Sequence, residues 1–397
     1  MRRRASRREE LPRRVEIPVP AANGPTVLAF GADLDSSACL LAEGRALVAP
    51  TGADLDGPGA VDALREVAAD LSAGVDGAPG GARGSGLPLI AHDSDAQLRA
   101  SVCALERDGA HVGVQHHHAH LAATLAEHGE NGPAVGVILD GPGLGPDGTV
   151  WGGELLVGDA GGYERAGLLF PVRLPGGDVA HLQPWRMACA WLTAATDGEP
   201  PSIPVRLAAT VSPVSWAAVC EQTRLGVASP LTTCAMRLLD AAAALCGIVA
   251  PLGRDGDAAR LLALEALPQP ERAYEMPLVE EGDAPILVDA RPALRALLAD
   301  LRRGVEMGEV SGRLREGFAV AFATASARIA ADRGIGVVVL AGRCFEDEVL
   351  LERTATLVAE AGLRPLTPLA LPAGDVAVSL GQALVAARSA GRRVADS

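Results

Sequence analysis

Four of the eight histidines of this chain lie within five positions, in the run QHHHAH at residues 115–120. His116 and His120 are four residues apart, so in a helix their imidazoles lie on one face, one turn apart. The Ala- and Leu-rich stretch 121–128 favours a helix. Two such imidazoles can share one ion, a third ligand must come from elsewhere, and imidazoles with a carboxylate suit Zn or Fe(II). Packed structural histidines or a solvated polar turn are the alternative.

A second run, DGPGLGPDG at residues 140–148, combines glycines with two aspartates. Glycines let backbone N–H groups approach an anion closely, and the aspartates can orient a metal or a hydroxyl group. A hairpin turn without a ligand explains the pattern equally well, because Asp147-Gly148 is a common turn signal. The run by itself therefore leaves a phosphate loop and a plain turn open.

Composition indicates a globular protein of 397 residues, 49% hydrophobic, with a formal net charge of -14. This charge argues against nucleic acid as a partner, because phosphate binding needs a basic face. The Arg-rich residues 1–24 are predicted to be a disordered tail. No apolar run reaches the roughly 18 residues that a membrane span needs, and we expect a cytoplasmic protein without a membrane partner.

Two residue types exclude further classes of site. The chain contains no lysine, which rules out a P-loop lysine and a Schiff-base lysine. Its seven cysteines include no Cys-x-x-Cys pair, which fits neither a disulfide framework nor a zinc ribbon. We expect these cysteines to be reduced and buried.

Strand patterns repeat along the chain. An apolar run at 26–30 leads into a Gly/Asp turn and a second strand at 38–41, and the run at 134–139 leads through Asp140-Gly141 into another strand at 153–157. Strands mixed with helical stretches predict mixed sheets with helices on their faces. The repetition predicts two lobes, residues 25–132 and 133–397.

Five longer strings resemble, in this order and at these separations, the carbamoyltransferase domain of the hydrogenase maturation protein HypF. They are QHHHAHLAA, VILDGPGLGPDGTVWGGELL, GGDVAHLQPWRMACAWL, SPLTTCAMRLLDAAAALCGI and LPAGDVAVSLGQALVA. The resemblance extends from about Val27 to about Ala387. It implies an α/β fold, the two-lobed actin-like ATPase architecture that this family shares with the TsaD proteins.

The resemblance also implies a metal site. In the family, two histidines four apart and a late aspartate hold a divalent metal, here Zn or Fe, beside the nucleotide. These ligands correspond to His116, His120 and Asp375. The third ligand that the histidine pair requires thus has a candidate, in the turn before the last helix, which the fold is expected to bring back across the cleft between the lobes.

Further residues are expected to bind the nucleotide or to take part in the reaction. Cofactor-binding positions are Asp33, Gly141, Gly143 and Gly342. Asp140 and Arg186 are expected to be catalytic, with Arg186 facing an anion. An Arg186 stacked on Trp185 as a structural cation–π pair is an equal alternative.

The family's reaction uses ATP and a carbamoyl group to make carbamoyl adenylate, and then passes the carbamoyl group to the C-terminal cysteine of a partner protein, HypE. The family's acylphosphatase-like, zinc-finger and YrdC-like domains are not recognisable in this sequence. A separate polypeptide is therefore expected to form the carbamoyl adenylate, and a HypE-like protein to accept the carbamoyl group.

Several positions depart from the family's pattern on the nucleotide side. Arg343 and Met236 stand where the family has glycine, residues 254–257 read Arg-Asp-Gly-Asp instead of Tyr-Glu-Gly-Gln, and Val376 and Ala377 replace two further glycines. Two hypotheses follow: a divergent carbamoyltransferase with an altered nucleotide pocket, or a non-catalytic homologue that serves as a scaffold.

A third reading is a metallohydrolase that uses His116, His118 and His120. The sequence contains no His-Glu-x-x-His motif, and no aspartate follows the cluster as the His-x-His-x-Asp-His type requires. This reading is therefore the weakest of the three.

Overall fold

The computed structural model describes residues 13–20, 24–76, 87–199, 201–249, 253–267 and 270–395. The chain forms two compact units. The first unit comprises Met1–Asn131, Ala160–Gly162 and Pro368–Ser397, and the second comprises Gly132–Asp159 and Tyr163–Thr367.

The first unit is built on one mixed sheet with the strand order β1-β4-β3-β2-β5-β6. Its elements are β1 (Val15–Pro18), β2 (Val27–Ala29), β3 (Ser37–Ala42), β4 (Arg45–Pro50), α1 (Ala60–Asp76), β5 (Leu89–Asp93), α2 (Arg99–Leu105), β6 (His111–Val114), α3 (His116–Glu127), η2 (Asp375–Ala377) and α12 (Val378–Ala395).

Strand β2 is apolar throughout because both of its faces are covered. Val27 and Ala29 pack into a cluster that contains residues of α12, whereas Leu28 packs into a second cluster with residues of α1 and α2. Side chains alternate between the faces of a strand, so a strand buried on both sides must be apolar at every position. The two clusters together form the core of this unit.

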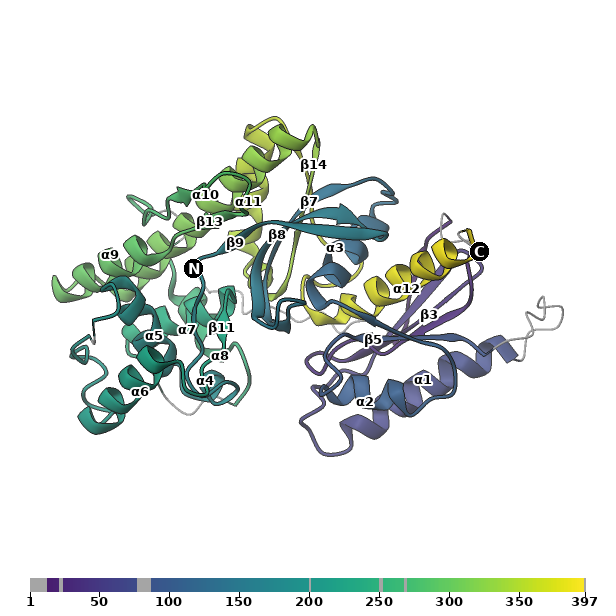
Figure 1. Ribbon diagram of the computed structural model, residues 1–397, viewed down its shortest axis with the longest axis horizontal. Helices are drawn as coiled ribbons and strands as arrows, with labels where there is room; N and C mark the ends of the chain where they lie inside the picture. Colours follow the sequence, from purple (N-terminus) through teal and green to yellow (C-terminus); the bar gives the residue numbers. More distant parts are fainter. Residues whose placement is uncertain are drawn as a thin grey trace, which may run out of the picture. The chain divides into compact units, whose positions relative to one another are not determined.

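Helix α12 places the C-terminal residues in the first unit. It lies beside α3 and across β3 and β5 (Figure 1), and its Leu380, Ala383 and Leu384 are buried in the cluster on that face of the sheet. The expected second lobe, 133–397, therefore differs from the observed second unit at its C-terminal end. The physical reason is the apolar face of α12, which is buried against the first sheet.

The expected disordered tail also contains regular structure. Residues 1–12 and 21–23 lie outside the described residues, but Val15–Pro18 forms strand β1, which pairs antiparallel with β4. Val15 and Ile17 are buried while Glu16 is exposed. This short alternation of apolar and polar side chains favours an edge strand, and the arginine-rich composition obscured it.

The second unit contains a larger mixed sheet whose main path is β12-β13-β9-β8-β7-β14-β15, with β11 and β10 branching from β8. Its strands are β7 (Ala134–Leu144), β8 (Val150–Asp159), β9 (Gly162–Leu169), β10 (Val172–Arg173), β11 (Leu231–Thr232), β12 (Leu278–Val279), β13 (Ile286–Val288), β14 (Val337–Ala341) and β15 (Arg364–Leu366). Its helices are α4 (Val179–Leu182), α5 (Trp185–Ala195), α6 (Pro213–Leu225), α7 (Ala235–Leu245), α8 (Asp257–Glu265), α9 (Arg291–Arg302), α10 (Met307–Arg333), η1 (Arg343–Glu346) and α11 (Glu348–Glu360).

The two sheets repeat one pattern of strand pairing. In the first unit, β2 pairs antiparallel with β3 and parallel with β5. In the second unit, β7 pairs antiparallel with β8 and parallel with β14. The duplication predicted from the repeated strand and Asp/Gly pattern is thus present in the topology.

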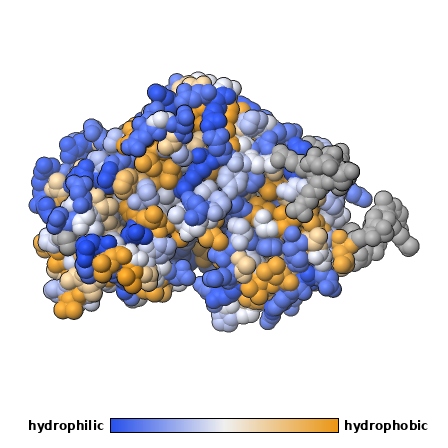
Figure 2. All heavy atoms as spheres, in the orientation of Figure 1, coloured by the Kyte–Doolittle hydropathy of each residue, from blue (hydrophilic) through white to orange (hydrophobic). Residues whose placement is uncertain are grey.

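Among the described residues, no helix is long and apolar enough to cross a membrane. On the face shown in Figure 2, hydrophilic side chains are interspersed with hydrophobic ones.

Candidate metal centre

Helix α3 presents His116 and His120 on one face. The helix begins directly at His116, and Gln115 caps it by accepting a hydrogen bond from the backbone N–H of His118 at 2.9 Å. The rings of His116 and His120 lie 5.1 Å apart between centroids. Both side chains are almost fully buried, with relative exposures of 6% and 1%. The predicted spacing of one helical turn is therefore realised inside the first unit.

Asp375 completes the group. Its Oδ1 lies 3.7 Å from Nε2 of His116 and 3.7 Å from Nε2 of His120. Candidate ligand atoms of these three residues all lie within 4.8 Å of one another. The structure thus brings together the three residues that the resemblance pointed to, and it does so within one unit, because η2 and α12 belong to the same unit as α3.

A very close contact between helices holds this arrangement. A Cβ atom at Gly381 of α12 would lie less than 3.0 Å from the carbonyl oxygen of Ala119 in α3. Glycine is therefore required where the two backbones meet. Since Ala119 lies between the two histidines, the contact fixes the start of α12, and with it Asp375, against the histidine helix.

Buried hydrogen bonds tie the start of α12 to the first sheet. Gln382 accepts a hydrogen bond from the N–H of Gly31 at 2.8 Å and donates one to its carbonyl at 2.9 Å. The Ser37 hydroxyl donates to the carbonyl of Val376 at 2.9 Å and contacts the hydroxyl of Ser379 at 2.7 Å. These contacts immobilise the residues that follow Asp375.

Glu127, at the end of α3, holds the segment before Asp375. Its carboxylate accepts hydrogen bonds from the backbone N–H groups of Leu369, Ala370 and Leu371, at 3.3, 2.9 and 2.8 Å. Burial raises the pKa of Glu127, although these three donors favour the ionised form. The loop carrying Asp375 is therefore attached at both ends to the unit that carries the histidines.

Asp93 is a member of the site that the sequence analysis did not identify. His116 Nδ1 lies 2.9 Å from Oδ2 of Asp93, which is 1% exposed. A carboxylate can only accept a hydrogen bond, so Nδ1 carries the proton and the lone pair of Nε2 faces Asp375. A carboxylate that orients a histidine in this way is typical of metal sites. Its signal in the sequence was an aspartate at the end of an apolar strand.

The donor set fits a divalent metal ion. Two ligands about 2.1 Å from one zinc ion in tetrahedral geometry lie about 3.4 Å apart. The observed nitrogen-to-oxygen distances of 3.7 Å are close to this value. Two imidazoles, one oriented by Asp93, and one carboxylate are ligands that suit Zn or Fe(II).

The neighbouring histidines have other roles. His117 Nδ1 accepts a hydrogen bond from the amide of Gln115 at 2.9 Å, and the N–H of His118 donates to the same side chain. Among the described residues, the group that could hold a metal contains neither of them. The metallohydrolase reading, which requires His118 as a ligand, therefore receives no support.

Asp33 is engaged with the backbone of α2. Its carboxylate accepts hydrogen bonds from the N–H groups of Arg99 and Ala100 at 3.1 and 2.9 Å, at the first turn of that helix. Burial raises the pKa of Asp33, against the effect of these donors. In this structure the carboxylate predicted to bind the cofactor accepts hydrogen bonds from backbone N–H groups in the first turn of α2, which have no partner within the helix itself.

The Asp/Gly run of the second unit is mainly a strand and a turn. Strand β7 continues to Leu144 with an irregularity between Leu139 and Gly143, so Gly141 and Gly143 lie on the strand. The turn follows, where Gly148 N donates to the carbonyl of Gly145 at 3.0 Å. Asp147 accepts hydrogen bonds from Thr149 and pairs with Arg165 at 3.0 Å. Residues 145–148 therefore match the hairpin-turn alternative.

Gly342 and Asp140 meet where β14 ends beside β7. Gly342 has φ +101°, and a Cβ there would lie less than 3.0 Å from the carbonyl oxygen of Leu139, so glycine is required for packing. The buried carboxylate of Asp140 accepts a hydrogen bond from the N–H of Arg343 at 2.9 Å.

The Arg343 side chain points into the space beside Gly141 and Gly256. Its Nη2 donates to the carbonyl of Asp255 at 3.0 Å, and only 6% of the residue is exposed. A Cβ at Gly256 would lie 3.3 Å from this Nη2, and one at Gly141 would lie 3.8 Å from Nη1. The two glycines are thus faced by a guanidinium group of the chain itself.

Arg186, at the first turn of α5, is bound to neighbouring side chains of the second unit. Its Nε donates to Gln183 at 2.7 Å, and its guanidinium lies 5.2 Å from the centre of the Trp185 ring. Burial lowers the pKa of Arg186. The stacking alternative is therefore present in the structure.

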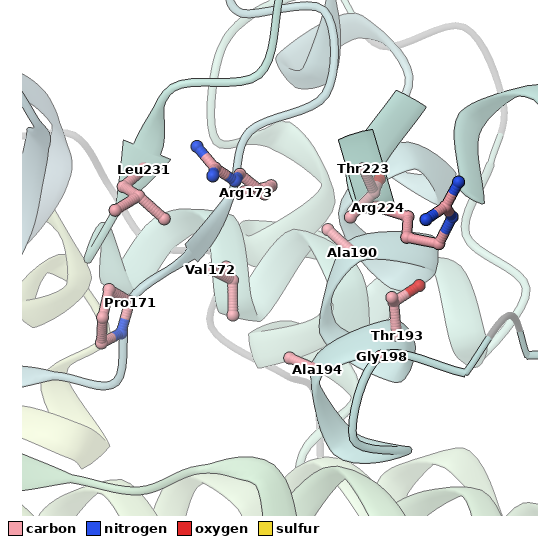
Figure 3. Close-up of a pocket in the computed structure, with 10 residues that line it drawn as sticks. All are labelled: Pro171, Val172, Arg173, Ala190, Thr193, Ala194, Gly198, Thr223, Arg224 and Leu231. Atoms are coloured by element: carbon pink, nitrogen blue, oxygen red, sulfur yellow. The ribbon is translucent and has the colours of Figure 1, made fainter. Parts of the chain in front are cut away.

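A cavity of about 240 Å³ lies elsewhere in the second unit, between β10, α5 and α6 (Figure 3). The hydroxyls of Thr193 and Thr223, which line it, donate to carbonyls of their own helices. Its described lining contains none of the predicted site residues.

Comparisons with known proteins agree with the sequence resemblance. A family model described as the HypF Kae1-like domain matches residues 22–127, and one described as carbamoyltransferase, Kae1-like domain, second subdomain, matches residues 136–382. The chain is 35% identical over 393 residues to the carbamoyltransferase HypF of Rhodobacter capsulatus, covering 96% of this chain and 49% of that protein. It is 36% identical over 384 residues to a carbamoyltransferase HypF homolog of Cupriavidus necator, covering 94% of each.

The fold is found in solved structures. A crystal structure of full-length HypF in the phosphate- and nucleotide-bound form matches with a TM-score of 0.83 and 25% identity, over 94% of this chain and 57% of that one. HypF of T. kodakarensis matches with a TM-score of 0.81 and 24% identity, over 95% of this chain and 50% of that one. These matches confirm the predicted two-lobed fold. The chain covers 49% of the length of HypF from R. capsulatus and 48% of the length of HypF2 from C. necator. It therefore spans about half the length of these relatives.

Proposed function

This chain belongs to the HypF carbamoyltransferase family, and we propose that it transfers a carbamoyl group to a protein acceptor with the help of a divalent metal ion held by His116, His120 and Asp375. The observation that carries the proposal is the convergence of these three buried side chains, with each imidazole Nε2 3.7 Å from the same carboxylate oxygen. The setting is the maturation of [NiFe]-hydrogenase.

The residues of the chain prepare this site before any substrate arrives. Asp93 keeps the proton on Nδ1 of His116, so the unprotonated Nε2 is the nitrogen that would bind the ion. Asp375 adds a negative charge that favours a cation between the three side chains. When bound, a divalent metal supplies Lewis-acid polarisation of a carbonyl oxygen. Burial of all three ligands strengthens electrostatic interactions at the site, because water is excluded.

We propose that the donor is carbamoyl adenylate made by a separate polypeptide and that the acceptor is the C-terminal cysteine of a HypE-like protein. In the transfer, the cysteine sulfur attacks the carbamoyl carbon and a C–S bond forms. The bond from that carbon to the phosphate oxygen breaks, AMP leaves with the bonding electrons, and the thiol proton is released. The products are a thiocarbamate, AMP and a proton.

Transfer of a radiolabelled carbamoyl group to a HypE-like acceptor, with the carbamoyl adenylate supplied by the separate polypeptide that forms it, tests this function. We expect His116→Ala and Asp375→Ala to lower the transfer rate at least about a hundredfold, because a Lewis-acid metal contributes several kcal/mol to the transition state. His111→Ala is the matched control: His111 is exposed, its Nε2 contacts the carbonyl of Arg107, and the rate should not change. Unchanged transfer by the His116 and Asp375 variants would exclude the proposed metal site from the reaction.

The alternative is a non-catalytic homologue that acts as a scaffold. The observation that favours it is the guanidinium of Arg343 in front of Gly141 and Gly256 on the expected nucleotide side. A folded, metal-loaded wild-type chain that binds a HypE-like protein but transfers no carbamoyl group would support the scaffold and contradict the enzyme.

A further inference from the structure

We infer that Arg343 and Met236 close the glycine cradle of the second unit, so that this chain takes up no free adenine nucleotide there. The name glycine cradle here means Gly141, Gly256 and the carbonyl group of Asp255. The inference deepens the proposed function, on which it rests, by stating in what form an adenylate donor can reach this chain.

Two large side chains from distant parts of the sequence converge on one glycine. A Cβ at Gly256 would lie 3.3 Å from Nη2 of Arg343, 3.5 Å from Sδ of Met236 and 3.6 Å from Cε of Met236. Gly256 has φ +83°, in the region that favours glycine. Both large residues stand at positions where the resemblance expects glycine. The space beside Gly256 is therefore bordered at about van der Waals distance, on two sides, by side chains of the chain itself.

The Arg343 side chain is fixed in this position. It is buried, Nη2 donates to the carbonyl of Asp255 at 3.0 Å, and the backbone N–H donates to Asp140 at 2.9 Å. The second hydrogen bond also anchors the start of η1. A free nucleotide would have to break the contact with Asp255 and displace a guanidinium that has little solvent to move into.

Charge reinforces this position. Arg237 donates to Asp255 and pairs with Asp240 at 3.1 Å. Burial raises the pKa of Asp255, but the positive charges of Arg237 and Arg343 outweigh it and leave the pKa lowered. Two cations thus face Asp240, which is buried, and Asp255, which is partly buried; burial raises the pKa of Asp240 to about 7, against the effect of both guanidinium groups. Moving Arg343 away to admit a phosphate would leave the carboxylates with one cation and would place more negative charge beside them.

The cradle therefore holds an internal cation where a nucleotide is expected. A donor that carries an adenylate group must then keep that group bound to the protein that made it, and present the carbamoyl end. Free ATP and free AMP should have no measurable affinity for this chain, whether or not it transfers carbamoyl groups.

Calorimetric titration of the full-length chain with Mg-ATP, without donor or acceptor, tests the inference. We expect no binding by the wild type and measurable binding by the double variant Arg343→Gly, Met236→Gly, with an affinity at least about tenfold above the weakest that the titration can detect. The matched control is Arg343→Lys, Met236→Leu, which keeps charge and bulk and should bind no better than the wild type. Thermal unfolding of each variant verifies that it is folded.

Measurable binding of Mg-ATP by the wild type would overturn the inference. So would a folded glycine variant that gains no affinity, or a lysine and leucine variant that gains as much. None of these results depends on carbamoyl transfer. A failure of the proposed function would appear in the transfer assay and not in this titration. If the double glycine variant does not fold, the single variants Arg343→Gly and Met236→Gly are titrated in its place. The same criteria apply to them.

Discussion

The imidazole of His116 contacts two carboxyl groups through its two nitrogens. Nδ1 lies 2.9 Å from Asp93, and Nε2 lies 3.7 Å from Asp375. The shorter distance is that of a hydrogen bond, and the longer one is that of two ligands sharing an ion. The two nitrogens of the ring therefore have different partners: Nδ1 fixes the orientation of the imidazole, and Nε2 faces the carboxylate with which it would share a metal ion.

Asp93→Asn should weaken metal binding at this site by about 10- to 100-fold, which is the usual effect of losing a partner that orients a ligand. The asparagine amide can present a donor to Nδ1 and thereby favour the tautomer with the proton on Nε2, which cannot bind a metal. Competition with a chelator of known affinity measures the change. Asp108→Asn, at an exposed position of the same unit, is the control. Equal affinities for the wild type and Asp93→Asn would show that Asp93 has no role in orienting His116.

At the scale of elements, the site depends on how closely α3 and α12 approach each other. Helix α3 carries both histidines, and the residues before α12 carry Asp375. At Gly381 the backbones are so close that a Cβ would overlap the carbonyl group of Ala119. Small residues allow the backbones to meet, and the hydrogen bonds of Gln382 and Ser379 prevent α12 from sliding along the sheet.

Gly381→Ala should lower the free energy of unfolding by about 1–3 kcal/mol, the usual range for overpacking, because its Cβ would overlap the carbonyl of Ala119. Metal affinity should fall as well, since Asp375 must shift. Gly391→Ala in the same helix is the matched control: its added Cβ meets nothing within 4 Å, so a better helix former should leave stability equal or slightly higher. Denaturant unfolding and chelator competition measure both effects. A Gly381→Ala variant as stable as Gly391→Ala would disprove the close contact.

At the scale of the whole molecule, the chain leaves the first unit near residue 131, contributes residues 160–162 to it, and returns to it at residue 368. The first unit is thus assembled from both ends of the sequence. A metal bound by His116, His120 and Asp375 joins the N-terminal and the C-terminal part of this unit. Binding of the metal ion should therefore stabilise the first unit selectively.

Hydrogen exchange with and without zinc measures this selectivity. At a free metal concentration about 100 times the dissociation constant, any opening that breaks the site should become less favourable by about 2.7 kcal/mol. Protection should rise in α3 and in residues 371–382, while α9 of the second unit should not change. Asp375→Ala should abolish the gain. Equal protection of α9 and α3 by zinc would argue against a site confined to these three ligands.

Local patterns in the sequence were sufficient for much of this description. The spacing of His116 and His120 placed both on one helical face, because helical periodicity is a property of the chain itself. The apolar runs predicted β2 and β7, since strands covered on both faces must be apolar. The strings shared with HypF were sufficient to single out Asp375, although more than 250 residues, from His120 to Asp375, separate it from its partners.

Contacts between distant segments were decided by the tertiary structure and could not be predicted from local sequence patterns. Asp93, Gly381 and Glu127 have ordinary sequence surroundings, and only the packing of α3 and α12 on one sheet gives them their partners. The assignment of residues 368–397 to the first unit likewise follows from which apolar face covers which sheet, a contact between distant segments. The substitution at Arg343 was visible in the sequence, but where its guanidinium ends depends on Asp255 and Gly256, which approach it only in the folded chain.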